Sequence, residues 1–337
     1  MAAKYAKDMP VGFTNRIEKV AIVGAGGTVG KYMTEELLKT GKHTVTAITR
    51  QGSTNKLPEG VRVARVDYAD EASLAEALRG QEFLIITMNA TAPPDTQVKL
   101  VRAAAAAGVR WVMPNFYGPD FKSEGLERDV AGLWRTPRAV IAEAAALGVS
   151  SWVVMSCGFW YQFSLAGSPD RFGFDLARRE VTLFDDGEAK MNVSTWEQCG
   201  RAAAALLSLP ELPADEADGA TTLARWRDDV LYVSSFLVSQ RDMLASLRRV
   251  TGTGEAEWTV KREGAAERWR EGQEAMRKGD RKGFVRQMYS RVFYPGDGDF
   301  GARRGLANEA LGLPVEDLDE ATAEAVKLAE SGALELY

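Results

Sequence analysis

Histidine and cysteine are nearly absent from this chain of 337 residues, which has one histidine, His43, and two cysteines, Cys157 and Cys199. A Ser-His-Asp triad would depend on His43, which sits in a Gly-Lys-His turn entering a strand, so this type of hydrolase is not expected. A zinc site needs three or four His or Cys ligands, so we expect no metal site. The two cysteines are expected to stay reduced, with Cys157 as a small core residue.

Long apolar runs and an excess of positive charge are also missing. No apolar stretch approaches the roughly 20 residues needed to span a bilayer, and residues 1–18 read as a flexible leader without an apolar signal core. Acidic residues outnumber basic ones by 47 to 42, and the pI is near 5.3, so a basic footprint for nucleic acid is lacking. We therefore expect a cytoplasmic protein with a small-molecule substrate and neither a nucleic-acid nor a membrane partner, and a homodimer is left open.

What the chain does have is apolar content, 45% of its residues, arranged in alternating patterns. Short apolar runs predict buried strands, and amphipathic segments between them predict helices. Over about 140 residues this alternation predicts an α/β fold, an NAD(P)-binding Rossmann fold with a parallel doubly wound sheet. The predicted strands are 19–24, 44–49, 61–66, 83–87, 109–113 and 151–155, and the predicted helices are 28–39, 70–78, 96–107 and 133–147.

The character of the sequence changes after residue 157. We assign 19–157 to the NAD(P)-binding Rossmann domain and 158–337 to a smaller mixed, mostly helical substrate-binding region that interleaves with the Rossmann sheet. Thr195 opens a capping-box pattern that predicts a helix to Leu207. Further strands are expected at 180–184, 190–193 and 229–236.

The stretch KVAIVGAGGTVGKYM, residues 19–33, carries the main binding motif. Its glycines do not fit the G-x-G-x-x-G spacing, but Gly24, Gly27 and Gly30 form a G-x-x-G-x-x-G frame between an apolar strand and a periodic helix. Such glycines allow the sharp turn, the approach of a pyrophosphate and close helix–strand packing. We predict dinucleotide binding by this loop, including Thr28 and Val29, whereas a tight structural turn without ligand is the alternative.

The end of the second strand indicates which dinucleotide binds. NAD-binding folds place an acid there, but this strand ends in Arg50, followed by Lys56. An arginine suits a 2′-phosphate because it forms bidentate hydrogen bonds. The prediction is therefore NADPH, against the alternative of a solvated surface arginine.

The tips of the third and fourth strands complete the predicted cofactor site, since ligands gather at the carboxyl ends of parallel strands. Asp67 and Tyr68 follow the third strand and are assigned to the adenine side. Met88, Asn89 and Ala90 follow the fourth and are assigned to the nicotinamide ribose. Simple loop capping is the alternative for both tips.

Two later segments carry a family resemblance. Together with the glycine loop and Arg50, the segments 114–120 (PNFYGPD) and 156–161 (SCGFWY) resemble the NmrA-like and isoflavone-reductase-like families, which are atypical short-chain dehydrogenase/reductases, in their fungal form. The resemblance implies an NADPH-binding fold with a substrate cleft over the nicotinamide. It also implies that residues 114–118 and 158–161 lie at that cleft, and Asn115, Phe116, Gly158 and Phe159 are assigned to the cofactor.

The proton donor is harder to identify. No tyrosine has a lysine four residues later, so the usual Tyr-x-x-x-Lys dyad is missing. Isoflavone-reductase-like enzymes use a lysine at the start of the helix after strand five, but the chain reads LWRTPR at 133–138, where Arg138 could only stabilise an oxyanion. The remaining candidate catalytic residues are Tyr117, Tyr161 and Lys122, with Asp120 as a possible orienting group.

The resemblance leaves two functional classes open. One is an NADPH-dependent reductase of a small, mostly apolar or aromatic secondary metabolite, acting on a C=C, C=O or quinone-methide-like acceptor. Aromatic residues near the sixth strand could form an apolar lid over the substrate of such a reductase, or could simply be part of the core.

The other class is a non-catalytic NmrA-like NADP(H)-sensing regulatory protein, which the missing lysine favours. The aromatic residues considered for the lid of a reductase are Phe116, Trp152, Phe159, Trp160 and Phe163.

Overall fold

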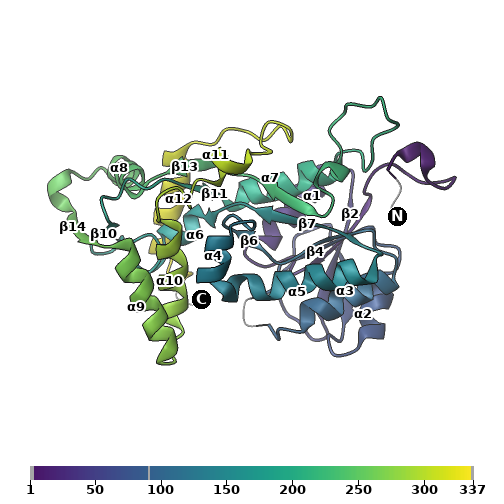
Figure 1. The fold of residues 1–337 in the computed structure, drawn as a ribbon, viewed down its shortest axis with the longest axis horizontal. Helices are drawn as coiled ribbons and strands as arrows, with labels where there is room; N and C mark the ends of the chain where they lie inside the picture. Colours follow the sequence, from purple (N-terminus) through teal and green to yellow (C-terminus); the bar gives the residue numbers. More distant parts are fainter. Residues whose placement is uncertain (1–3, 90–91, 335–337) are drawn as a thin grey trace.

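The computed structural model describes residues 4–89 and 92–334. Figure 1 shows a twisted parallel sheet with helices on both faces, continued at one end by a second, smaller assembly of helices and short strands. The helices α1 and α7 lie side by side on one face of the sheet, while α2, α3 and α5 cover the other. The fold class predicted from the sequence is therefore confirmed.

The first half of the chain alternates as expected, although several boundaries move by one or two residues. After a short 3₁₀ turn, Ala6–Asp8, the elements are β1 (Lys19–Val23), α1 (Gly30–Lys39), β2 (Thr44–Arg50), β3 (Arg62–Val66), α2 (Glu71–Leu78), β4 (Phe83–Ile86), α3 (Thr96–Ala106), β5 (Trp111–Met113), β6 (Tyr117–Gly118), α4 (Glu124–Asp129), α5 (Ala131–Leu147) and β7 (Ser151–Ser156).

The main sheet has the strand order β12-β7-β5-β4-β1-β2-β3, with β6 paired to β7. All of its pairings are parallel, and β1 is flanked by β2 and β4, with Val20 opposite both Val45 and Phe83. The chain therefore changes direction across the sheet between β1 and β4. In doubly wound folds, the crevice at the carboxyl ends of these two strands is where ligands bind.

Local sequence explains why these elements form. The apolar runs of β1 and β4 are almost wholly buried, as expected for central strands covered on both faces. The Asp70 side chain accepts a hydrogen bond from the Ala72 amide and so caps α2, as the sequence predicts. Thr195 caps α7 in the same way through the Gln198 amide.

The second half of the chain contributes to both parts of the molecule. β12 extends the main sheet beyond β7 and α7 packs on α1, whereas the remaining strands form two small sheets, β14-β10-β9 and β13-β11-β8. Its elements are β8 (Phe159–Trp160), α6 (Tyr161–Leu165), β9 (Phe174–Asp175), β10 (Glu180–Phe184), β11 (Met191–Ser194), α7 (Trp196–Leu207), β12 (Asp229–Tyr232), β13 (Phe236–Val238), α8 (Gln240–Thr251), β14 (Thr259–Glu263), α9 (Ala265–Arg277), α10 (Lys282–Val292), α11 (Phe300–Arg304) and α12 (Leu318–Glu330).

The prediction of one strand, at 229–236, is wrong. The segment 229–236 is not a single strand but divides into β12 and β13, which belong to different sheets. The chain turns between them at Ser234, whose hydroxyl donates to the carbonyls of Val193 and Phe236. The apolar run in the sequence cannot reveal this change of sheet. Its first part pairs with β7 in the main sheet and its second part with β11 in a small sheet, and both environments favour apolar side chains.

Residues 4–18, expected to be a flexible leader, contact the segment before β12. The Asn15 side chain exchanges hydrogen bonds with the backbone of Leu212 in both directions, at 2.7 and 2.8 Å. Ile17 is 1% exposed and packs in the core beneath α1 and α7. These contacts fasten the leader to the Rossmann half of the molecule.

Candidate cofactor-binding and active site

The glycine loop lies over the carboxyl end of β4. Gly24 has a φ of +83°, and a Cβ there would lie 2.0 Å from the Thr87 carbonyl oxygen. A Cβ on Gly30 would lie 2.2 Å from the Gly24 carbonyl oxygen and 2.4 Å from Thr87 Oγ1. The Thr87 hydroxyl in turn donates to the Val23 and Gly24 carbonyls. Gly24 and Gly30 are therefore required for packing between β1, α1 and β4.

Gly27 has a different environment. It is exposed, and a Cβ there would meet only the Gly24 carbonyl oxygen, at 3.1 Å. Thr28 is half-buried beside it, and Val29 is buried at the N-cap of α1, where no side chain caps the first amides. The open face at Gly27 and the uncapped helix N-terminus fit the approach of a pyrophosphate to the backbone.

Gly26, which the G-x-x-G-x-x-G frame leaves unexplained, also has a packing role. A Cβ on Gly26 would lie 2.3 Å from the carbonyl oxygen of Lys56. The segment after β2 therefore folds directly against the glycine loop and brings Lys56 next to it. Spacing within the motif could not show this, because the contact joins two separate loops.

Arg50 ends β2 beside the glycine loop. Its side chain is exposed, and within the described residues no carboxylate forms an ion pair with it. Tyr68 lies nearby and donates to the Ile48 carbonyl at 3.2 Å; burial raises the pKa of Tyr68 to about 12, and the charge of Arg50 opposes the shift. The Asp67 carboxylate accepts from the Ala69 amide, which is the local capping considered as the alternative.

The nicotinamide side of the predicted site is formed by the tips of β4 and β5. Asn115 Nδ2 donates to the Met88 carbonyl at 2.8 Å, and its backbone amide donates to Gln97 Oε1 at 3.3 Å. Asn115 therefore joins the two loops. Asn89 is exposed next to Met88, whereas Ala90, also predicted here, lies outside the described residues.

Three other predicted cofactor residues have structural roles of their own. Phe116 is 2% exposed, with its ring centroid 4.8 Å from that of Phe121. Phe159 is 6% exposed and stacks on Tyr289 at 4.0 Å. Gly158 has a φ of +69°, and a Cβ there would lie 1.9 Å from the Asn192 carbonyl oxygen. Their contact with a cofactor stays a prediction.

Tyr117 is the candidate donor nearest the cofactor crevice. Its hydroxyl donates to the Ile86 carbonyl at 3.0 Å, at the carboxyl end of β4. Burial, together with the neighbouring thiols of Cys157 and Cys199, raises the pKa of Tyr117 well above its usual value. The phenol is therefore protonated at neutral pH.

The other two candidate donors are engaged elsewhere. Tyr161 is fully buried, with its hydroxyl 2.7 Å from Thr322 Oγ1 in α12, and burial raises its pKa. The Lys122 ammonium forms an ion pair with Asp229 at the start of β12. The structure does not bring Tyr117, Tyr161 and Lys122 into a single hydrogen-bonded group, and their catalytic roles stay predictions.

Asp120 and Arg138 are likewise tied into structural contacts. The Asp120 carboxylate is fully buried, accepts from the Tyr232 hydroxyl at 2.7 Å and pairs with Arg304 at 3.1 Å. Arg138 pairs with Glu127 at 2.7 Å and lies over the ring of Phe121.

His43 is structural. Its ring nitrogens contact the Ile17 carbonyl at 2.8 Å and the Ser208 hydroxyl at 3.3 Å, and burial lowers its pKa. Within residues 4–89 and 92–334, no group of three His, Cys, Asp or Glu side chains could hold a metal ion. Over the same residues, no helix combines the length and apolar character needed to cross a bilayer.

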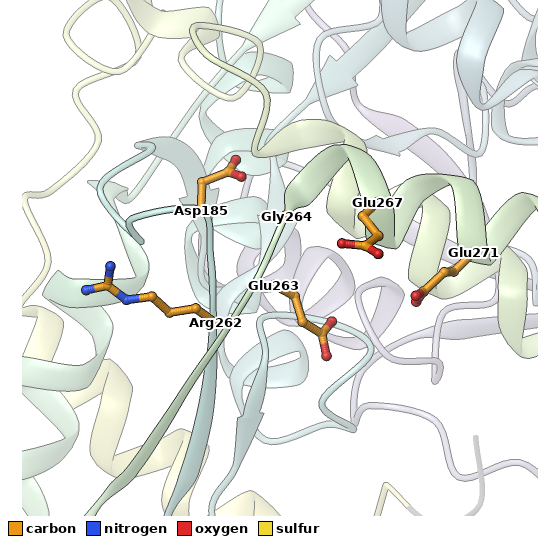
Figure 2. A pocket seen from close by; sticks show the side chains of 6 residues that line it. All are labelled: Asp185, Arg262, Glu263, Gly264, Glu267 and Glu271. Atoms are coloured by element: carbon orange, nitrogen blue, oxygen red, sulfur yellow. The ribbon is translucent and has the colours of Figure 1, made fainter.

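A surface hollow of about 390 Å³ lies at the other end of the molecule, where β14 leads into α9 (Figures 1 and 2). Figure 2 shows Glu267 and Glu271 projecting from α9 and Glu263 from the end of β14. Two of these three carboxylates are already paired, Glu263 with Arg268 at 2.6 Å and Glu271 with Arg286. This hollow has no contact with the glycine loop.

The chain has a Rossmann-type fold whose glycine cradle is of the kind found in dinucleotide-binding proteins. Residues 16–164 match the model of the NmrA-like family, which confirms the predicted resemblance. The oxidoreductase aprR of Aspergillus flavus is 29% identical over 92% of this chain and 99% of its own length. The oxidoreductase poxI of Penicillium oxalicum is 26% identical over 92% of this chain and 94% of its own. Similarity to these two enzymes over nearly the full length confirms the expected oxidoreductase class.

Solved structures confirm the fold over about nine tenths of the chain. The NADPH-dependent quinone oxidoreductase of Escherichia coli aligns with a TM-score of 0.65 at 19% identity, over 91% of this chain and 99% of that protein. Leucoanthocyanidin reductase of Vitis vinifera aligns with a TM-score of 0.72 at 12% identity, over 92% and 99%. The C-terminal assembly is therefore part of the shared fold.

Proposed function

We propose that this protein is an NADPH-dependent reductase of a small, mostly apolar or aromatic secondary metabolite. The observation that carries the proposal is the pairing of the Gly24–Gly30 cradle with Arg50, an exposed cation at the end of β2 that forms no ion pair with any carboxylate in the described part of the chain. Such a group suits a 2′-phosphate, but unlike a carboxylate it cannot accept hydrogen bonds from the ribose hydroxyls of NADH. The oxidoreductases among the relatives support the reductase class, and the NADPH named for the Escherichia coli quinone oxidoreductase supports the cofactor.

Each part of the crevice has a role in this proposal. The backbone at Gly27 and the first amides of α1 bind the pyrophosphate, Arg50 and Lys56 hold the 2′-phosphate, and Asn115 fixes the loops on the nicotinamide side. NADPH, when bound, supplies a hydride to a C=C, C=O or quinone-methide-like acceptor. For a carbonyl substrate, Tyr117 is the proposed proton donor because its protonated hydroxyl lies at the end of β4.

The cofactor proposal is tested by replacing Arg50→Ala and measuring NADPH and NADH dissociation constants by calorimetry. Loss of a charged hydrogen-bonded contact should weaken NADPH by about 10- to 100-fold and leave NADH nearly unchanged. Arg62→Ala is the matched control, since Arg62 is also exposed but begins the adjacent strand β3, at the amino ends of the strands and away from Arg50. Equal losses for both cofactors would refute the role of Arg50.

A non-catalytic NADP(H)-sensing protein is the second candidate. It is favoured by the missing lysine near Arg138 and by the engagement of Tyr161 and Lys122 in contacts away from the crevice. In a sensor, the affinity for NADPH would depend on Arg50 in the same way, but the protein would not oxidise NADPH with any acceptor.

NADPH oxidation by the wild type and by Tyr117→Phe separates the reductase from the sensor and tests Tyr117 as the proton donor. If the protein reduces carbonyls and Tyr117 protonates the product, turnover with a carbonyl acceptor should fall by about 10²-fold, with NADPH affinity retained. Steady-state NADPH oxidation measures this, and Tyr294→Phe, at a half-buried tyrosine on the α10 side, is the control. An unchanged rate removes Tyr117 as the donor, and no rate with any acceptor in the wild type favours the sensor.

A further inference from the structure

A second surface hollow, of about 310 Å³, lies along β12, the strand at one edge of the main sheet. Its walls also come from the loop before α4, the 3₁₀ turn Leu223–Trp226, and the end of α11 with the residues that follow it. Four strand spacings of about 4.8 Å separate β12 from β1, roughly 19 Å in all, so this β12 hollow is distinct from the glycine loop. Its volume is within the range of small-molecule sites, roughly 300–1,000 Å³.

Three cationic side chains line the β12 hollow: Lys122, Arg225 and Arg304. Lys122 pairs with Asp229, and Arg304 pairs with the buried Asp120 at 3.1 Å. Arg225 is exposed and lies over the Trp226 ring, 5.4 Å from its centroid, and it forms no ion pair with any carboxylate in residues 4–89 and 92–334. Its guanidinium is therefore available to a ligand, and a carboxylate fits its forked N–H donors.

The lining of the β12 hollow carries an excess of positive charge, although the whole protein has a net charge of −5. Against the three cations, the described lining residues include one carboxylate, that of Asp229. Behind them, Asp120 is shared by Arg303 and Arg304. The Tyr232 hydroxyl, which donates to Asp120, stays neutral because burial and this carboxylate raise its pKa. An anion is therefore attracted to the hollow against the charge of the protein as a whole.

Apolar side chains lie beside these cations. Trp226 and Val230 belong to the lining and are 7% and 5% exposed, whereas Leu306, also in the lining, is 40% exposed. A ligand that offered only charge would leave Leu306 in water. A ligand with a flat apolar body would cover Leu306 and pack on the Trp226 ring as well, which removes apolar surface from water.

We infer that the β12 hollow is a binding site for a small organic monocarboxylate with an aromatic body. Its carboxylate accepts hydrogen bonds from Arg225 and from Lys122, whose ammonium has three donors. Its ring lies against Trp226 and Leu306. One negative charge matches Arg225, the lining cation without a carboxylate, whereas a second charge would be repelled by Asp229. This site lies beyond the proposed reductase function and does not depend on it.

The test is a calorimetric titration of the full chain, with and without NADPH, using four probes. They are 2-naphthoate; 2-naphthamide, which has the same shape without the charge; acetate, which has the charge without the rings; and inorganic phosphate. We expect 2-naphthoate to bind at one site per chain, tighter than each of the others by about tenfold or more at low salt. Raising the salt concentration should weaken 2-naphthoate but not 2-naphthamide. NADPH should leave the affinity for 2-naphthoate unchanged.

Two variants separate the charged from the apolar part of the site. Arg225→Gln should weaken 2-naphthoate by about tenfold and leave 2-naphthamide nearly unchanged, because it removes the charge that pairs with the carboxylate. Leu306→Ser should weaken both naphthalene probes by about 3- to 10-fold, because it removes apolar contact. Arg262→Gln is the matched control, since Arg262 is an exposed cation that lines the other hollow, at β14 and α9. Thermal denaturation checks that each variant is folded.

Several outcomes overturn the inference. They are 2-naphthamide or inorganic phosphate binding as tightly as 2-naphthoate, the same effect of Arg225→Gln and Arg262→Gln, competition between 2-naphthoate and NADPH, or no saturable binding of 2-naphthoate. Failure of the cofactor proposal is a separate result, because the titrations without NADPH would still show 2-naphthoate binding that depends on Arg225.

Discussion

Gly26, Gly27 and Gly30 lie within one short loop, yet their missing side chains serve different purposes. Gly26 makes room for the Lys56 carbonyl and Gly30 for the end of β4, so both are needed by the folded protein itself. Gly27 is exposed, and a Cβ there would meet only the Gly24 carbonyl oxygen, at 3.1 Å. Under the function proposed above, the missing side chain of Gly27 leaves room for the pyrophosphate to approach the backbone.

This difference predicts separate effects on stability and on binding. Gly30→Ala should lower the melting temperature and abolish NADPH binding, because its Cβ would clash with backbone at 2.2 Å. Gly27→Ala should lower the melting temperature far less than Gly30→Ala, because its Cβ would meet the Gly24 carbonyl oxygen only at 3.1 Å, but it should weaken NADPH by about tenfold or more, because its methyl group occupies the phosphate side. Gly219→Ala, in open space, is the control for both measurements. Full NADPH affinity in Gly27→Ala would contradict the phosphate role.

At the scale of elements, the segment between β6 and α4 is fastened by Asp120. This buried carboxylate receives the Tyr232 hydroxyl from β12 and the guanidinium groups of Arg303 and Arg304 from α11. It also accepts from the Lys122 amide at 3.0 Å, which shapes its own turn. One side chain thus joins three elements that are distant in sequence around the candidate donor Tyr117.

Asp120→Asn should therefore destabilise the protein by about 1–3 kcal/mol, since a buried charged acceptor loses its charge while its arginine partners remain. Chemical denaturation measures the change in the free energy of unfolding. Asp8→Asn, at an exposed position in the leader, should leave that free energy unchanged within error. If Asp120→Asn were as stable as Asp8→Asn, the network would not fasten these elements.

At the scale of the whole molecule, the two parts predicted from the sequence, 19–157 and 158–337, share one sheet. β12 pairs with β7 from Asp229 to Tyr232, and α7 covers the face beside α1. Without these elements, a fragment of residues 1–157 would expose the β7 edge and the apolar cluster around Met33 and Cys157.

We therefore expect the fragment 1–157 to lack a cooperative thermal transition and to bind the dye ANS, whereas the full chain unfolds sharply and does not bind it. Circular dichroism and dye fluorescence make the comparison. A fragment that unfolds cooperatively and binds NADPH with the affinity of the full chain would show that 19–157 is an independent domain.

The sequence by itself determined the Rossmann alternation, the glycine loop and Arg50 at the end of β2, because each depends on local periodicity or on a few adjacent residues. Only the tertiary structure decided what surrounds each candidate donor. Tyr161 meets Thr322, Lys122 meets Asp229, and Trp160 reaches Trp196 through Phe163. These partners are far apart in the chain, and no local pattern encodes them, because the environment of a side chain is set by packing between elements.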